Sequence, residues 1–216
     1  MKTQRYRIIF SKTEAMRFTG HLDLILTWER TFRRAGLPLS YSEGFNPRPV
    51  INLASPLPLG FISTAEIGDF WLSQNIPHDE FQSSLINALP PGLDIQRIDD
   101  IELIHGDKLP GLVESSEYTI TLSEEVSDLD NKIEILLKSD KYIRSRKGKD
   151  YDLRPLIHYV KLVESPPGTL PILKTSLYTL PTGTGRPDEV LASLEIPSHQ
   201  ALICRTAINL KSGDND

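Results

Sequence analysis

The stretch of sequence that decides the fold is residues 20–36, GHLDLILTWERTFRRAG. Its apolar residues recur three or four positions apart, at Leu22, Ile25, Trp28 and Phe32. This spacing predicts an α-helix over residues 20–35 that buries one face. Gly36 is suited to end the helix, because glycine readily adopts the left-handed conformation that follows a helix C-terminus.

The opposite face of the predicted helix is polar and carries Asp23, Thr27, Arg30 and Arg34. We expect it to present the two guanidinium groups to solvent or to a ligand. His21 lies at the start of the helix, where unpaired backbone N–H groups favour an anion such as a phosphate. A histidine in this place could bind the anion or transfer a proton, or it could simply cap or pack.

Further elements around this helix set the fold class. The predicted elements of the first half are a strand at 5–10, the helix, strands at 50–54 and 65–72 that pair as a hairpin, a helix at 78–89 and a strand at 93–101. Their order is β-α-β-β-α-β. This is the order of a ferredoxin-like unit, an antiparallel sheet with both helices on one face.

The second half predicts a similar succession after an interruption at residues 105–111. Its predicted elements are a strand at 117–122, a helix at 128–139, strands at 153–163 and 172–180, a helix at 187–194 and a strand at 201–210. We therefore expect an α+β protein of two ferredoxin-like units, over residues 1–105 and 112–211, with a frayed tail at 212–216.

Bulk composition agrees with two small folded domains. The chain has 216 residues, of which 39% are hydrophobic and 25% charged, close to the globular average. It has no apolar run near the ~18 residues that span a bilayer, and its start does not resemble a signal peptide. We expect a cytoplasmic protein without a membrane contact. Its one cysteine, Cys204, cannot form an internal disulfide, and we expect a buried structural thiol.

Charge is distributed unevenly along the chain. The net charge is −5, yet residues 1–50 hold nine basic against four acidic side chains, and residues 141–161 hold seven against two. The remainder therefore carries −15. Two basic islands in an acidic protein indicate a localised anion-binding surface, with ordinary ion pairs on solvated faces as the alternative.

The sequence contains no signature of a familiar enzyme. It lacks a P-loop, the dinucleotide fingerprint GxGxxG, the zinc motif HExxH and the nucleophile motif GxSxG. The segment TGTGRP at residues 182–187 resembles a phosphate loop only superficially, because it has no lysine, and it predicts a flexible turn. We expect no metal, no cofactor and no catalytic activity.

Candidate anion-binding residues fall into three clusters. The first gathers around the predicted helix, at Arg17, His21, Arg30 and Arg34. The second is the loop SYSEGFNPRP at residues 40–49, with Asn46 and Arg48, which in this topology can return close to the helix N-terminus. The third is the stretch RSRKGKDYDLRP at residues 144–155, with Arg146, Lys147, Lys149 and Arg154.

The third cluster combines charge with aromatic rings. Arginine and lysine attract phosphates in a salt-dependent way, and Tyr142 and Tyr151 could stack on unpaired bases. A basic hairpin loop that is merely solvated is the alternative interpretation.

The same clusters carry a resemblance to a known family. The matching stretches are YRIIFSK at residues 6–12, RFTGHLDL at 17–24, ERTFRRAGLP at 29–38, SEGFNPRP at 42–49, PLPLG at 56–60 followed by Glu66, KGK at 147–149 and DLRP at 152–155. With them the chain resembles the bacterial radical-SAM-linked proteins, a family of unknown function found fused to, or encoded beside, radical-SAM enzymes.

This resemblance implies a companion to a radical-SAM enzyme that acts on RNA. The chain has no cysteine triplet for an iron–sulfur cluster, so a separate polypeptide would supply the radical-SAM domain. The first half also resembles the ferredoxin-like RNA-processing proteins of CRISPR systems in its order of strand, helix and glycine-rich loop.

Three functions are consistent with these observations. The one we expect is a non-catalytic RNA-binding or substrate-presenting companion of a radical-SAM enzyme in RNA modification. The second is a metal-independent ribonuclease, in which His21 is the general acid or base and Arg17 or Arg48 stabilises the developing charge. The third is a protein-interaction adaptor that docks the radical-SAM partner.

Overall fold

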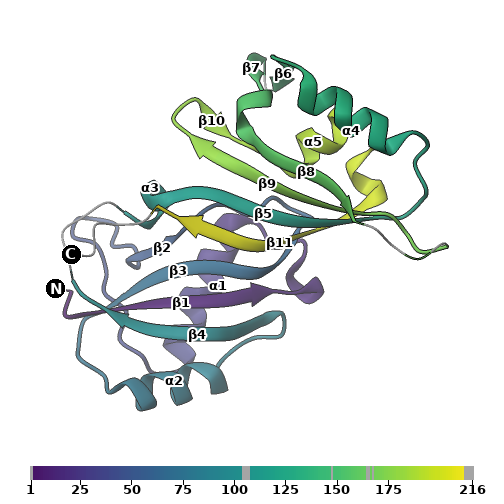
Figure 1. Cartoon of the computed structure of the whole chain (residues 1–216). Helices are drawn as coiled ribbons and strands as arrows, with labels where there is room; N and C mark the ends of the chain where they lie inside the picture. Colours follow the sequence, from purple (N-terminus) through teal and green to yellow (C-terminus); the bar gives the residue numbers. More distant parts are fainter. Residues whose placement is uncertain (1, 104–107, 147, 164–165, 167, 212–216) are drawn as a thin grey trace. The chain divides into compact units, whose positions relative to one another are not determined.

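The computed structural model describes residues 2–103, 108–146, 148–163, 166 and 168–211. The chain divides into two compact units, Met1–Leu112 and Val113–Asp216. Both units contain strands and helices (Figure 1), so the predicted α+β class is confirmed. None of the helices in the described part of the chain has the length and apolar character that crossing a bilayer requires.

The first unit contains the predicted succession of strands and helices. Its strands are β1 (Gln4–Lys12), β2 (Ile51–Leu53), β3 (Ile62–Leu72) and β4 (Leu93–Ile101). Its helices are α1 (His21–Arg34), α2 (His78–Asn87) and α3 (Leu109–Leu112), with a 3₁₀ turn at Glu14–Met16. The strands pair in the order β4-β1-β3-β2, and every pair is antiparallel.

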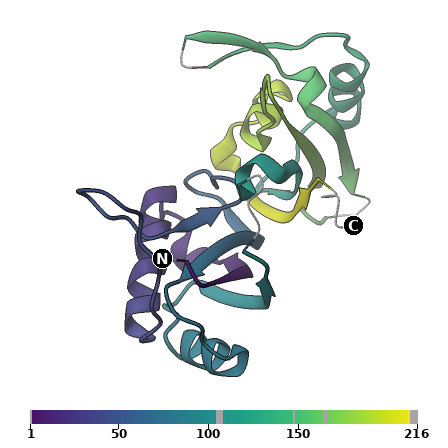
Figure 2. The ribbon, with the colours of Figure 1, turned by 90° about the vertical axis from the view of Figure 1, so that its left-hand side faces the viewer.

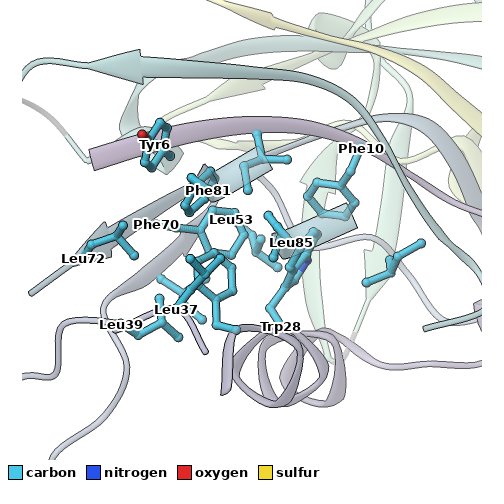
Figure 3. Packing of buried hydrophobic residues seen from close by; sticks show 14 of the residues in the cluster. Tyr6, Phe10, Trp28, Leu37, Leu39, Leu53, Phe70, Leu72, Phe81 and Leu85 are labelled. Carbon is cyan, nitrogen blue, oxygen red and sulfur yellow. The ribbon is translucent and has the colours of Figure 1, made fainter. Parts of the chain in front are cut away.

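One face of these strands packs against both α1 and α2. Every second side chain of β1 is fully buried there, at Tyr6, Ile8 and Phe10. They join one core with Trp28 and Phe32 of α1 and Phe81 and Leu85 of α2 (Figure 3). Because residues two apart on a strand share a face, this alternation fixes which side of the sheet the helices cover.

The buried face of α1 differs from the predicted one. Leu24, Trp28, Thr31 and Phe32 are buried, whereas Leu22 is 76% exposed. Residues 22–26 are nearly all apolar, so spacing alone does not fix the phase of the helix. On an α-helix Leu24 lies about 40° from Trp28, whereas Leu22 lies about 120° away. The two aromatic side chains therefore set the phase, and Leu22 falls outside the core.

The other face of the first unit's strands carries a buried charge cluster. Asp69 of β3 is fully buried and lies opposite Arg7 of β1 in the strand register. Arg7 donates to its carboxylate from Nε at 2.8 Å and from Nη2 at 3.0 Å, and Arg5 also donates to it. One carboxylate is thus held by two guanidinium groups.

The second unit repeats the strand order of the first. Its principal strands are β5 (Val113–Leu122), β8 (Ile157–Val163), β9 (Ile172–Leu180) and β11 (Ala201–Leu210). They pair antiparallel in the order β8-β9-β5-β11. The helices are α4 (Leu129–Lys138) and α5 (Pro187–Ser193), with 3₁₀ turns at Arg154–Leu156 and Ser198–Gln200.

Two additions decorate this second unit. Strands β6 (Ile143–Arg146) and β7 (Lys149–Asp152) form a separate hairpin that projects from the unit (Figure 2). The short strand β10 (Gly183–Thr184) pairs with the end of β9. Both additions lie at the candidate site described below.

Two local predictions for the second unit are corrected. The strand predicted from residue 153 begins at Ile157, because the Asp152 carboxylate accepts the N–H groups of Tyr142 at 2.9 Å and Arg154 at 3.1 Å and holds a turn there. Cys204 is half-buried rather than buried, because it alternates along β11 with the buried side chains of Ile203 and Arg205 and so points to the other side.

Candidate anion-binding site

A pocket of about 380 Å³ lies in the second unit, where the β6–β7 hairpin meets the turn that follows β9. Its polar lining consists of three cationic side chains, a phenol and two hydroxyls, from Arg146, Lys149, Arg186, Tyr151, Thr182 and Thr184. Guanidinium, ammonium and hydroxyl groups are the donors that bind phosphate oxygens. The pocket therefore has the chemistry of an anion site.

The hairpin brings two of the cations together. Arg146 of β6 lies directly opposite Lys149 of β7 in the strand register, and both side chains are exposed. The turn between them uses Gly148, whose φ of +74° suits glycine. Lys147, a predicted site residue, lies outside the described residues. Within the part of the chain that is described, neither Arg146 nor Lys149 forms an ion pair, so both charges are available to a ligand.

The TGTGRP segment also lines the pocket, and it pairs with β9 where the sequence predicted a flexible turn. Gly183 and Thr184 pair with Leu180 and Thr179 of β9. The N–H of Gly185 donates to the Tyr178 carbonyl at 2.9 Å. The segment runs from a strand into α5, as the strand predicted at 172–180 and the helix predicted at 187–194 imply.

Gly185 is required by a close backbone approach. A Cβ atom there would lie 2.8 Å from the Leu156 carbonyl oxygen and 2.8 Å from the Leu177 Cβ. Neither contact can be relieved by rotation of a long side chain. Glycine therefore lets the segment lie against β9 and against Leu156, which also lines the pocket.

Carboxylates hold two further arginines, Arg186 and Arg144, in place. Arg186 donates to Asp188 from Nε at 3.0 Å and from Nη2 at 2.8 Å. Arg144 donates from Nε to Glu189 at 3.0 Å. These pairs fix the guanidinium groups and offset part of their charge. The net positive charge of the pocket thus comes chiefly from Arg146 and Lys149.

Tyr151 is oriented by the Glu189 carboxylate, which also accepts from Arg144. Burial, and next the adjacent Glu189 carboxylate that accepts its hydrogen bond, raises the pKa of the Tyr151 phenol to about 12. The phenol therefore stays protonated and neutral at physiological pH. Its ring is anchored beside the three cations, where it can contribute an apolar surface to a ligand.

Two other predicted site residues, Arg154 and Arg34, donate hydrogen bonds to backbone carbonyls. Arg154 donates to the carbonyl of Leu137 at 3.1 Å and to that of Ile157 at 3.2 Å, which ties the turn to the end of α4. The Arg34 guanidinium donates to the Ala88 carbonyl, with Nε at 3.0 Å, which links α1 to the end of α2. Arg34 is nevertheless exposed, as predicted for the polar face of α1.

Arg17 likewise contacts its own unit. Its Nε donates to the Gly60 carbonyl at 2.8 Å, and its Nη1 lies 3.8 Å from Glu14. His21 is the first residue of α1 and is half-buried. Arg30, farther along the helix, is exposed.

The base of the loop of residues 40–49 is anchored beside α1. Its base is fixed by the Tyr41 hydroxyl, which donates to Glu29 of α1 at 3.0 Å, and by a bridge between Tyr41 and Pro49. Asn46 and Arg48 are exposed on it. Glu29 lies eight residues after His21, about 12 Å along the helix. The base of the loop therefore sits beside the middle of α1 and not at its N-terminus.

Sequence reasoning missed the contribution of Arg186, Thr182 and Thr184 to the pocket. The signal was the TGTGRP segment itself, whose small and hydroxyl-bearing residues precede an arginine. The segment has no lysine of its own, and the cations that complete the pocket lie on the β6–β7 hairpin, about 35 residues away in the sequence. Of the predicted residues that the structure describes, it brings Arg146 and Lys149 together in this pocket.

The fold and the pocket define a two-unit α+β protein with a cationic pocket in its second unit. The chain belongs to the family DUF2344, described as uncharacterized proteins conserved in bacteria, whose family model matches residues 5–187. No curated protein matches the sequence significantly.

Similar solved structures are distant. A chain of a Cbf5–Nop10–Gar1 complex has a TM-score of 0.49 and 11% identity, covering 97% of this chain and 50% of that chain. A chain of the archaeal box H/ACA sRNP Nop10–Cbf5 complex has a TM-score of 0.44 with the same identity and coverage. This chain thus spans about half the length of both. The acetolactate synthase small subunit from Thermotoga maritima has a TM-score of 0.29 and 13% identity, with 99% coverage of each chain. At these scores neither a function nor a partner follows.

Proposed function

We propose that this protein is a non-catalytic RNA-binding companion of a radical-SAM enzyme, and that it presents RNA to that enzyme for modification. The observation that carries the proposal is the pocket of the second unit, where Arg146, Lys149 and Arg186 converge with two threonine hydroxyls. In a chain with a net charge of −5, such a concentration of donors favours a local anionic ligand over a general coat of nucleic acid.

The geometry of the pocket suits the phosphate backbone of RNA. Arginine fixed by a carboxylate retains N–H groups for phosphate oxygens, and lysine adds a point charge. Tyr151 offers a neutral ring beside these cations, as expected for a ligand that alternates charged phosphates with flat bases. A small inorganic anion would make no use of that ring.

The radical-SAM partner enters the proposal through the resemblance of the sequence motifs. We further infer that both units are ferredoxin-like, since each follows the order β-α-β-β-α-β with antiparallel pairing of its main strands. The two units would then be variants of one plan, of which only the second acquired the β6–β7 hairpin.

A ribonuclease centred on His21 receives less support. Arg17 is held by Gly60 and Glu14, and the loop that bears Arg48 is anchored beside Glu29. These contacts do not assemble an acid, a base and a charge stabiliser around one point, which acid–base cleavage requires.

The adaptor function remains a second candidate because of one observation. Phe18, Leu22 and Leu59 of the first unit are 74%, 76% and 63% exposed. Large apolar side chains exposed in one region often mark a protein-binding surface. Binding of a radical-SAM protein that persists after nuclease treatment and is lost in Leu22→Gln would favour the adaptor over the RNA companion.

The test of the RNA proposal is a charge reversal in the pocket. Fluorescence anisotropy of a labelled oligoribonucleotide should show binding by the wild type and a loss of at least tenfold in the double variant Arg146→Glu/Lys149→Glu. The matched control is Lys108→Glu/Lys138→Glu, which changes the net charge equally at two exposed lysines outside the pocket. Equal losses in both variants, or none in the pocket variant, would contradict the proposal.

A further inference from the structure

We propose that the open face of β8 and β9, which adjoins the pocket, is a stacking platform for unpaired bases, so that the RNA held by this protein is single-stranded. The inference rests on the proposed function of the pocket, and it names the class of RNA. Its evidence is a separate set of side chains, on the sheet and outside the pocket lining.

The strand register determines which side chains share the open face. Along β9, Leu173, Thr175 and Leu177 are buried on one side, so Lys174 and Tyr178 point to the other. In the pairing of β8 with β9, Tyr159 lies opposite Ser176 and Lys161 lies opposite Lys174. Paired residues point to the same side of a sheet. The open face therefore carries two tyrosines and two lysines from adjacent strands.

A bulge adds a third ring to this face. The register of β8 shifts between Ile157 and Tyr159, so His158 is the extra residue of a β-bulge. The His158 ring stacks on that of Tyr178, with centroids 5.1 Å apart and an interplanar angle of 27°. His158 is exposed and Tyr178 is half-buried, so the histidine forms the outer layer of the stack. A base can extend this stack outward.

The two lysines on this face add positive charge beside the aromatic rings. The Lys161 ammonium lies 5.2 Å from the centroid of the Tyr159 ring, and both Lys161 and Lys174 are exposed. Glu117 of the adjacent β5 also points to this side, opposite Ser176, and its carboxylate accepts from Asn209 at 3.4 Å. Rings flanked by lysines are the arrangement that binds single-stranded nucleic acid, through stacking and phosphate contacts.

The platform and the pocket are continuous along the chain. Leu156 lines the pocket and His158 follows it by two residues, while Tyr178 precedes the pocket residue Thr182 by four. The Tyr178 carbonyl also accepts the N–H of Gly185. Two residues of a strand span about 7 Å, which is on the scale of one nucleotide. We propose that an RNA chain with a phosphate in the pocket continues along β8, so that its next base comes to the level of the His158 ring.

This arrangement discriminates against a duplex. The bases of an A-form helix are stacked on one another, so their faces cannot lie on a protein ring. A duplex could still reach the pocket with its phosphates, but it would gain nothing from His158 or Tyr178. The single-stranded form should therefore bind more tightly at equal phosphate number.

The experiment compares an oligouridylate with an RNA duplex that has the same number of phosphates, by anisotropy at one salt concentration. We expect the wild type to bind the oligouridylate at least tenfold more tightly. His158→Ser/Tyr178→Ser should lose that preference, and His158→Phe/Tyr178→Phe, which keeps flat rings, should retain it. The exposed single variant His158→Ser, whose folding is checked by circular dichroism, should lose several-fold in affinity for the oligouridylate alone.

The outcomes separate this inference from the function on which it rests. Equal binding of both RNAs by the wild type, unchanged in the serine variants, would overturn the platform and leave RNA binding by the pocket intact. Absence of binding of either RNA by the wild type would overturn the proposed function, and the platform with it. Loss of duplex binding in His158→Ser would also contradict the platform.

Discussion

Tyr151 shows how one residue reports on the state of the pocket. Its phenol has a pKa raised from 10.0 to about 12 by burial and by Glu189. The folded protein therefore holds the phenolic proton more tightly than the unfolded chain does. The resulting stabilisation is complete below a pH of about 10 and is lost as the pH rises through about 12.

We expect the free energy of unfolding to fall over that pH interval and to fall less in Tyr151→Phe, which has no phenolic proton. Urea unfolding at a series of pH values measures both curves. The variant is a fair comparison because its ring keeps the same shape. Superimposable pH profiles would contradict a raised pKa of Tyr151 in the folded protein.

Asp69 is the residue on which the charge balance of the first unit depends. Its carboxylate is fully buried between Arg5 and Arg7, whose side chains are 12% and 20% exposed. Asp69→Asn should lower the free energy of unfolding by about 3–5 kcal/mol, because two largely buried guanidinium groups lose their counter-charge. Asp99→Asn removes the carboxylate of the more exposed pair with Arg97 and should cost less than about 1 kcal/mol. Urea unfolding of both variants tests this contrast, and similar costs would refute it.

At the scale of the element, α1 has two apolar faces and only one is buried. Leu24 is 3% exposed and Leu22 is 76% exposed, although both are leucines on the same two turns. Leu24→Ala should lower the free energy of unfolding by about 2–5 kcal/mol, whereas Leu22→Ala should change it by less than about 1 kcal/mol. Denaturant midpoints of the two variants give the answer. A larger cost at Leu22 would support the buried face that spacing alone predicts, which includes Leu22.

Helices and strands were predictable from the sequence where a segment shows a periodic pattern of apolar residues. The strand predicted at residues 93–101 is β4, and the helix predicted at 20–35 is α1 with one residue fewer at each end. The phase of α1 was not predictable, because consecutive apolar residues satisfy several phases and only packing against Phe10 and Phe70 selects one.

The roles of individual arginines were even less accessible from the sequence. Arg146 and Arg154 belong to the same basic stretch, yet one lines a pocket and the other donates to backbone carbonyls. Local charge is the same in both cases. What differs is the path of the chain, which brings Leu137 to one guanidinium and the TGTGRP segment near the other.

At the scale of the whole molecule, the acidic balance of the chain limits where the proposed RNA ligand can bind. The net charge is −5, and three cations line the pocket. Binding of single strands loses about 0.7 in log K per log unit of salt for each phosphate contacted, so three contacts predict a slope of about −2. Anisotropy titrations across a salt series measure it. We expect Arg146→Glu/Lys149→Glu to flatten the slope, and a much steeper wild-type slope would indicate a wider RNA surface than the pocket.

The contact of Gly185 with Leu156 and Leu177 bears on how this protein could vary during evolution. At 2.8 Å from both atoms, an added methyl group forces either the strand or the turn to move. A related protein that replaces this glycine must therefore either rebuild the wall of the pocket or lose the pocket. In an alignment of related bacterial sequences, position 185 can thus serve as a marker: lineages that keep glycine there can keep this wall of the pocket unchanged, whereas lineages without it have rebuilt or lost the wall.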